Sequence, residues 1–343
     1  MSAEYTFDSG GYAEPIQPLT DVHAEPDQVY PLAGYDQLDI FRNPYGSRAD
    51  VDLEPLDALK ATAAAYECDT FEHHTSQHLQ ENINALQEHV TAGSLVVVRA
   101  GDGGVSGMLS AMRAAQLENP VLVMPGGNKN DIATALQTPE LLEHPEGALL
   151  CPVCTVRPIV VSFGPEGEEP ITLDAYGYAS VGISGLVAAR VNDPNYRQSR
   201  LHHLPGGRWL AEGWLAARTF VQAKPFTITG SDGESQPTLD LILANGNQMA
   251  GNLHPAANLL EPGLRLIHAR RKLGALATIG NMMLGRPTGE AVDADERREL
   301  ILNIPTGRET YLQVDGEQHR LVGRVVLSFQ VAPTGVNVLS LAT

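Results

Sequence analysis

The stretch Val96–Met112, VVVRAGDGGVSGMLSAM, constrains the fold of this chain more than any other. A run of β-branched apolar residues, typical of a buried strand, passes through a glycine turn into small and apolar residues with helical spacing. The turn, AGDGG, carries one carboxylate, Asp102, at the start of the predicted helix. Glycines there let the backbone approach a phosphate, which a carboxylate would repel unless a metal ion lay between them. The stretch therefore predicts a strand-turn-helix unit that binds a phosphate through a cation.

A second turn of the same kind follows the next predicted strand. The segment MPGGNKND ends with Asn130 and Asp131 at a helix start. Strand and helix patterns alternate up to about residue 150, which predicts βαβ units and a parallel sheet. Two consecutive turns would then lie at the carboxyl edge of one sheet, where open α/β sheets bind ligands. The first turn alone could equally be a glycine-capped loop with Asp102 in solvent; the second turn favours a binding site.

Two familiar phosphate-binding motifs do not fit these turns. The dinucleotide motif GxGxxG fails because Ser106 occupies the third glycine position, and the strand VLVMPGG ends without an acid for a ribose hydroxyl. The Walker A motif fails because no Gly-Lys-Ser/Thr follows the turn.

The segments on either side of this α/β pattern have a different character. Residues 1–36 are rich in Asp, Glu, Pro, Gly and Tyr without periodicity, and we predict a disordered acidic arm. After about residue 150, short strand-like runs are bounded by Gly, Pro, Asn and Asp. These runs predict a mostly antiparallel, β-rich second domain, either a sandwich or a barrel.

Charge and hydropathy exclude several classes of protein. The net charge of −18 opposes general nucleic-acid binding, which needs a dense basic surface. The N-terminus lacks the basic and apolar regions of a signal peptide, and no apolar run reaches transmembrane length. We expect a soluble, cytoplasmic protein.

Taken in order, the segments resemble the diacylglycerol kinase catalytic-domain family, which includes soluble bacterial lipid kinases and sphingosine kinases. The resemblance runs from about Asp39 to the C-terminus. The matching segments are Asn43-Pro44, AGDGG, PGGNKND, YASVGISGLVAA, LANGNQMAGNLHPAANLLEPGLRLI and VDGE. It implies an ATP-binding α/β domain over residues 37–152, a lipid-substrate domain over residues 153–323, and a last strand, at about 324–343, that returns to the first domain.

The same resemblance implies an ATP-dependent kinase that phosphorylates a hydroxyl of diacylglycerol or a related lipid, with Mg²⁺. Asp102 would face the phosphates through Mg²⁺, and Glu317, helped by Asp315, would accept the proton of the lipid hydroxyl. Leu259 and Leu264 could offer backbone carbonyls to a second, structural Mg²⁺. The other nucleotide contacts would come from Asn43, Thr75, Ala100, Gly101, Gly103, Gly104, Gly127, Asn128, Asn130 and Asp131. Thr75 could equally cap the following helix.

Several positions depart from the family pattern. Ala100 replaces the first glycine of the turn, Gly104 replaces its threonine, and the acid usual in the following helix is missing from VSGMLSA. In the second turn, Asn128 replaces a threonine and Lys129 replaces a small residue. Lys129 could neutralise phosphate or block the pocket. Pro262 stands where the acid of the structural Mg²⁺ site is expected.

These departures leave three functions open: an active lipid kinase, a weak or inactive relative that binds nucleotide or lipid as a regulator, and an NAD kinase. The NAD kinase ranks below the others because PGGNKNDIA and the Asp-Gly-Glu motif resemble the lipid branch. The sequence identifies neither the lipid nor the oligomeric state.

Two basic segments run against the acidic character of the chain. The first contains Arg190, Arg197, Arg200, His202, His203 and Arg208. The second, IHARRKLGALATIGNMMLGR, joins Arg270 and Arg271 to an apolar helical pattern. Both lie in the predicted lipid domain, where they could be an ordinary solvated rim or a local contact with an anionic membrane surface.

Overall fold

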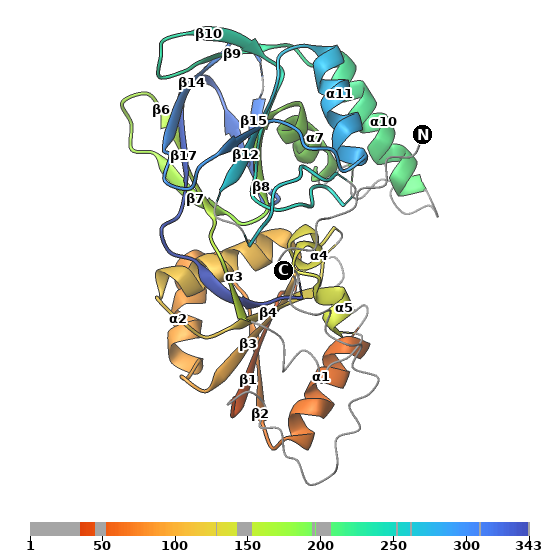
Figure 1. The fold of residues 1–343 in the computed structure, drawn as a ribbon, viewed down its shortest axis with the longest axis vertical. Coiled ribbons are helices and arrows are strands. Elements are labelled where there is room, and N and C mark those ends of the chain that lie inside the picture. The colour runs from red at the N-terminus through yellow and green to blue at the C-terminus, as the bar shows by residue number, and fades with distance from the viewer. Residues whose placement is uncertain are drawn as a thin grey trace, which may run out of the picture.

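The computed structural model describes residues 35–44, 53–127, 129–142, 153–193, 196, 207–251, 253–260, 263–308 and 310–341. The predicted acidic arm, residues 1–36, lies almost entirely outside the described residues. Figure 1 shows two domains, one above the other, joined by strands that pass between them. One domain is a mainly parallel α/β sheet and the other contains two antiparallel sheets, which confirms the predicted fold class.

The first domain is built on a six-stranded sheet with the order β2-β1-β3-β4-β18-β5. All neighbouring strands are parallel except β5, which pairs antiparallel with β18. The strands are β1 (Gln37–Arg42), β2 (Asp69–His74), β3 (Ser94–Ala100), β4 (Val121–Pro125), β5 (Val153–Val156) and β18 (Val336–Leu339). The helices are α1 (Glu54–Ala65), α2 (Leu79–His89), α3 (Asp102–Ala114), α4 (Asp131–Ala135) and α5 (Thr138–Leu142).

The central strand β3 is buried along its whole length because helices cover both faces of the sheet. Val96 and Val98 pack in the core that contains α2 and α3, whereas Leu95 and Val97 pack in the core that contains α1. This division follows from the two-residue period of a strand. It explains why the strand reads as a continuous apolar run rather than as an alternating one.

The second domain is a sandwich of two six-stranded antiparallel sheets. The first has the order β10 (Ser235–Thr238), β9 (Phe226–Thr229), β14 (Arg298–Ile304), β17 (Gly323–Val331), β6 (Ile159–Pro165) and β7 (Ile171–Ala175). The second has the order β13 (Glu290–Val292), β12 (Leu264–Ala269), β11 (Asp240–Ala244), β8 (Tyr178–Gly182), β15 (Thr310–Val314) and β16 (Glu317–Leu321). One apolar core joins them, with Phe163 and Leu327 from the first sheet and Val181 and Leu312 from the second. Three further helices are α7 (Ile183–Val191), α10 (Gly207–Gln222) and α11 (Lys272–Met283).

The C-terminal segment returns to the first domain later than about residue 324. Strand β17 pairs with β14 and β6 in the second domain, and β18 alone enters the first sheet. Pro333 and Gly335 lie between the two strands, where proline lacks the N–H that a ladder requires. At the other crossing, β5 pairs with β18, so Val153–Val156 contributes to the first sheet.

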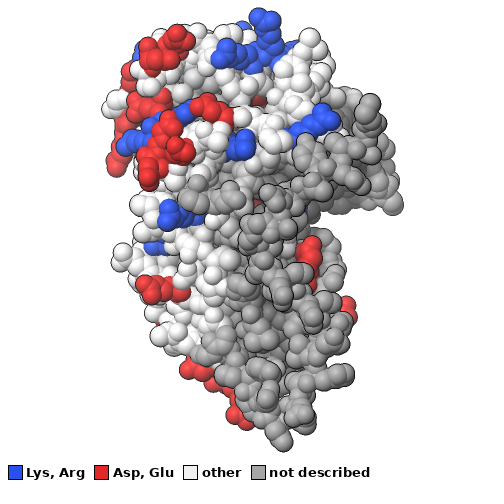
Figure 2. Space-filling view, viewed as in Figure 1, with Lys and Arg blue, Asp and Glu red and all other residues white. Residues whose placement is uncertain are grey.

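Among the described residues, no helix combines the length and the apolar character that crossing a bilayer requires. Charge is distributed unevenly over the surface. In Figure 2, Asp and Glu side chains gather on one flank of the β-rich domain, and several Lys and Arg side chains lie apart from that flank.

Candidate functional site

Four neighbouring strands of the parallel sheet end in residues predicted to contact nucleotide. Thr75 follows β2, Asn43 follows β1, Gly101 follows β3 and Gly127 follows β4. Because these strands are parallel, their carboxyl ends lie at one edge of the sheet. The backbone amides of Thr75 and Asn43 continue the ladder beyond the strands, donating to the carbonyls of Arg42 and Arg99 respectively. The sheet thus brings the predicted residues to one edge.

The two glycine turns at this edge touch each other through their backbones. A Cβ atom on Gly127 would lie 2.4 Å from the Cα atom of Gly101, and one on Gly126 would lie 2.9 Å from the amide nitrogen of Ala100. Neither position has room for a side chain. Asn130, in the left-handed region at φ 55°, holds the second turn, since its side chain accepts from the amide of Gly127 and donates to the carbonyl of Gly127. Asn128 lies outside the described residues.

Ala100 and Gly104, the two departures in the first turn, face each other. A Cβ atom on Gly104 would lie 2.8 Å from the Cβ atom of Ala100. Carbon atoms pack at about 3.5 to 4.0 Å, so the two positions cannot both carry a side chain in this backbone. The methyl group that Ala100 adds therefore occupies the place of the side chain that Gly104 lacks. The two departures compensate each other sterically, at the cost of one hydroxyl near the turn.

We therefore expect Gly104→Thr to destabilise the chain by roughly 1 to 3 kcal/mol, the usual cost of overpacking a tight site. Adding Ala100→Gly should recover most of that loss, because it removes the opposing methyl group. Urea unfolding of the two single variants and of the double variant measures the coupling. Equal stability of Gly104→Thr and the double variant would show that the clash is relieved in another way.

Asp102 begins α3 and points toward the start of α4. One of its oxygens, Oδ1, accepts a hydrogen bond of 3.0 Å from the amide of Ile132. Burial raises the pKa of Asp102. The amide of Ile132 and the neighbouring backbone amides lower it. The carboxylate of Asp102 therefore lies among backbone amides at the start of α4, at the carboxyl edge of the sheet.

Asp131 joins the first domain to the second. Its carboxylate accepts from the amides of Ala250 and Gly251, at 2.7 and 2.8 Å, in a loop of the second domain. Burial, together with the charge of Asp102, raises its pKa to about 6, although the two amides act in the opposite direction. Both oxygens of Asp131 are thus occupied by protein, and the residue holds the two domains together.

Lys129 also extends to the second domain. Its Nζ atom lies 3.7 Å from Oε2 of Glu212 on α10, and its side chain lies beside Gly251. It therefore crosses from the second glycine turn to the other domain. The ammonium group of Lys129 is thus paired with a carboxylate of the second domain.

Asp315 is buried in the turn between β15 and β16, with its backbone at φ 42°. Its carboxylate accepts from the amides of Tyr176, Gly177 and Tyr178, at 2.6 to 2.9 Å. It also accepts from Oγ of Ser106 on α3, at 2.9 Å. Burial raises its pKa to about 7, against these hydrogen bonds. Because the carboxyl group is buried and four donors surround it, we assign Asp315 to positioning the domain junction.

Glu317 lies two residues further on and is exposed at the start of β16. The turn before it packs on the glycine turn of the first domain, where a Cβ atom on Gly103 would lie 3.3 Å from the carbonyl oxygen of Asp315. The structure thus brings the Asp-Gly-Glu motif beside the first glycine turn. It separates the two acids into a buried one and an accessible one.

Leu259 and Leu264, the candidate carbonyl ligands of a structural Mg²⁺, have side chains in different cores. Leu259 packs with the first domain and Leu264 with the β-sandwich. Pro262, at the position expected for the acid of that site, lies outside the described residues. Within the described residues, no three His, Cys, Asp or Glu side chains form a group that could hold a metal ion. A single carboxylate, that of Asp102, is sufficient for Mg²⁺, because this ion commonly takes one or two carboxylates and completes its coordination shell with phosphates and water.

Sequence reasoning missed the residues that join the domains. Ser106, which only served to exclude a dinucleotide motif, bonds Asp315, and Arg113 on the same helix makes a bidentate pair with Asp174 on β7. Asn245 donates to the carbonyls of Arg157 and Tyr176. One signal was present: Ser106 lies four residues after Asp102, so both lie on one face of the helix.

Residues 38–155, which contain this sheet edge and both glycine turns, match the family described as the diacylglycerol kinase catalytic domain. This stretch is similar to that catalytic domain, and the match does not extend into the second domain. The resemblance stated from the motifs is confirmed, and a kinase is the activity that goes with such a domain. No curated protein matches the chain.

Solved structures share the fold over both domains. A diacylglycerol kinase from Bacillus anthracis str. Sterne is similar at 15% identity and a TM-score of 0.57, over 89% of this chain and 97% of that one. A second crystal structure from the same organism, described as a candidate diacylglycerol kinase, gives 15% identity and a TM-score of 0.59, over 89% and 98%. At this identity the likeness establishes the fold.

Proposed function

We propose that this chain is an ATP-dependent lipid kinase that transfers a phosphoryl group to a hydroxyl of diacylglycerol or a related lipid. The observation that supports the proposal is the contact between Gly103 of the first glycine turn and the turn that contains Asp315, two residues before Glu317. Phosphoryl transfer depends mainly on positioning and on charge neutralisation, so a base next to a phosphate cradle is the arrangement it needs.

In this proposal the two glycine turns bind the phosphates of ATP through backbone N–H groups at the starts of α3 and α4. Asp102 is the residue that would hold Mg²⁺, which supplies positive charge to the phosphates when bound. Glu317 accepts the proton of the lipid hydroxyl as the oxygen attacks the γ-phosphorus. Asp315 and Asp131 keep the second domain in register with the turns.

Asp102→Asn tests the nucleotide site. The amide oxygen of asparagine can still accept from Ile132, so the fold should be kept, whereas the charge that attracts Mg²⁺ is lost. We expect calorimetry to show at least roughly tenfold weaker binding of ATP with Mg²⁺, the loss of one charge-assisted contact. Glu88→Gln is the matched control. Glu88 is an exposed acid in the last turn of α2, and the strand that follows α2 begins at the opposite edge of the sheet from the glycine turns. Unchanged affinity in Asp102→Asn would remove Asp102 from the site.

Helix α11 offers a means of reaching lipid. Ala275 and Met282 anchor it, but Leu273, Met283 and Leu284 are 81%, 62% and 66% exposed. Arg270 and Arg271, just before the helix, are exposed as well. In the other basic segment, the side chains of Arg197, Arg200, His202, His203 and Arg208 lie outside the described residues. An apolar helix beside cations suits peripheral contact with an anionic membrane surface.

Charge reversal at Arg270 and Arg271 tests this contact. A cation near an anionic surface contributes about 1 kcal/mol, so the double variant to Glu should sediment far less with vesicles that contain phosphatidylglycerol. Wild-type binding should fall with added salt, and activity on detergent-dispersed lipid should stay unchanged. Arg297→Glu, an exposed cation elsewhere in the domain, is the control. Equal sedimentation of the reversed variant would assign these residues to an ordinary rim.

The activity itself is tested with radiolabelled ATP and diacylglycerol in mixed micelles. Labelled lipid product that requires Mg²⁺ supports the proposal. ATP binding without turnover on any lipid of a panel would favour a regulatory relative. Labelling of NAD instead would favour an NAD kinase.

A further inference from the structure

A cavity of about 770 Å³ lies in the second domain, away from the glycine turns. Gly182, at the end of β8, and Thr310, at the start of β15, line it. The opposite ends of these strands, Tyr178 and Val314, lie beside Asp315 at the domain junction. The cavity is therefore a strand length, on the order of 15 Å, from the proposed catalytic edge.

The base of the cavity is apolar. Ile183 and Leu186 come from α7, and Phe226, Leu239 and Ile304 come from the edge of the sandwich. Its size falls in the range of sites that bind small molecules, which combine an apolar lining with a few placed polar groups. An apolar base of this kind suits a hydrocarbon or glycerol portion of a ligand.

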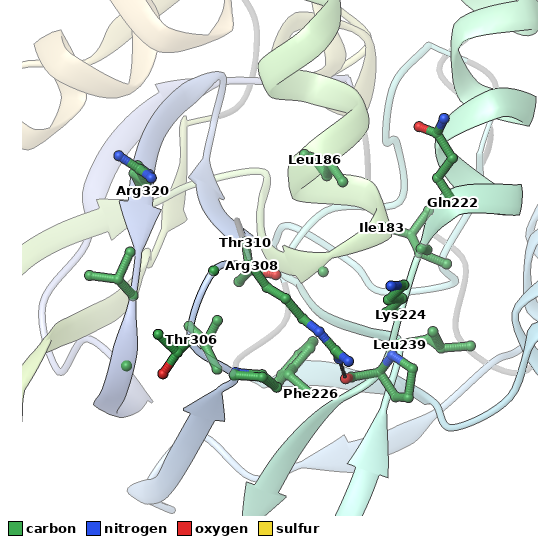
Figure 3. A pocket seen from close by; sticks show the side chains of 18 of the residues that line it. Ile183, Leu186, Gln222, Lys224, Phe226, Leu239, Thr306, Arg308, Thr310 and Arg320 are labelled. Atoms are coloured by element: carbon green, nitrogen blue, oxygen red, sulfur yellow. Dashed lines mark hydrogen bonds between the residues drawn. The ribbon is translucent and has the colours of Figure 1, made fainter.

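Four cations line the same cavity: Arg190, Lys224, Arg308 and Arg320. Figure 3 shows the last three reaching it from separate segments. Within the described lining there is no carboxylate. This concentration of positive charge stands out in a chain whose net charge is −18.

Two of the guanidinium groups are held in place by neutral acceptors. Arg190 donates to Oγ1 of Thr219, at 2.7 Å, and to the side chain of Gln222. Arg308 donates to the carbonyl of Pro225, at 2.9 Å (Figure 3). These bonds orient the two guanidinium groups without neutralising their charge, so both can pair with an anion in the cavity. Arginine and lysine together match the oxygens of a phosphate in geometry and charge.

We propose that this cavity binds a phosphate monoester, with the cations around the phosphate and the apolar base beneath the group that carries it. A phosphorylated diacylglycerol, the product of the proposed reaction, has both parts. The binding itself does not depend on that reaction, and the distance from the glycine turns makes the site regulatory rather than catalytic.

Isothermal titration calorimetry on the full chain, without ATP or Mg²⁺, tests the proposal. The probes are dihexanoyl phosphatidic acid, inorganic phosphate and uncharged dihexanoylglycerol. We expect phosphatidic acid to bind, and Lys224→Glu with Arg308→Glu to weaken it by at least about tenfold for each cation, since each makes a charge-assisted contact. Both side chains are exposed, so the double variant should fold. Arg297→Glu is the matched control.

The three probes distinguish a lipid phosphate from free phosphate. They also distinguish failure of this proposal from failure of the proposed kinase activity. Inorganic phosphate that binds as tightly as the lipid, with the same dependence on Lys224 and Arg308, assigns the site to free phosphate. Asp102→Asn should leave the binding unchanged, and binding should persist even if the chain has no kinase activity. The proposal is overturned if phosphatidic acid and phosphate both fail to bind, if the double variant binds like the wild type, or if dihexanoylglycerol binds equally well.

Discussion

Asp315→Ala is expected to lower the free energy of unfolding by roughly 3 kcal/mol or more at neutral pH. The substitution leaves three backbone amides, those of Tyr176, Gly177 and Tyr178, without their acceptor in a buried place. Each unsatisfied buried donor costs about 1 to 3 kcal/mol. Ser106 also loses one of its two acceptors and keeps the carbonyl of Asp174. Urea unfolding followed by circular dichroism measures the loss.

The pH dependence of this loss identifies the carboxyl group as its cause. Burial raises the pKa of Asp315 from 3.8 to about 7. The folded chain therefore keeps, from about pH 4 to pH 7, a proton that the unfolded chain has released. The stability from this group is fully present below about pH 4 and is lost as the pH rises through 7. The wild type should thus exceed Asp315→Ala by more at pH 5 than at pH 8, by roughly 2.5 kcal/mol, because about two pH units of the shift lie above pH 5.

Other buried acids do not obscure this comparison. Asp131 and Asp240 also have pKa values raised to about 6 by burial, so they add a slope of the same sign. That slope is common to the wild type and the variant, and the difference between them isolates Asp315. A difference that is the same at pH 5 and pH 8 would mean that Asp315 is ionised in the fold throughout this range.

The sequence was informative wherever one local pattern determines the geometry. The run Ser94–Arg99 predicted a buried strand, and the following glycine turn predicted a strand end at the binding edge. Two such turns on adjacent parallel strands necessarily meet at the same edge. The short runs after residue 150 predicted antiparallel sheets because each one is bounded by turn residues.

Contacts between distant segments could not be predicted in this way. Asp315 accepts from residues about 137 positions earlier, and Asp131 from residues about 120 positions later. Nothing local distinguishes a carboxylate that will bind amides from one that will bind a cation. The compensation between Ala100 and Gly104 is also invisible in the sequence, because the two residues read as separate departures until a backbone brings them within 2.8 Å.

The two acids of the Asp-Gly-Glu motif have different environments, and this difference predicts a large effect of substituting the second acid on turnover. Asp315 and Glu317 are two residues apart, but one is buried among donors and the other is exposed at the start of β16. If Glu317 accepts the lipid proton, Glu317→Gln should reduce kcat by roughly 10²- to 10⁴-fold, the usual contribution of a general base. The affinity for ATP should stay nearly unchanged, because the residue contacts the acceptor and not the nucleotide.

Stability distinguishes this catalytic role from the positioning role of Asp315. Glu317→Gln changes an exposed side chain, so its free energy of unfolding should stay within about 0.5 kcal/mol of the wild type. Asp315→Ala should lose stability and activity together, whereas Glu317→Gln should lose activity alone. In a protein with measurable turnover, full activity in Glu317→Gln would exclude it as the base. Since Asp315 is buried and surrounded by four donors, the proton would then have to pass to a water or to the phosphate itself.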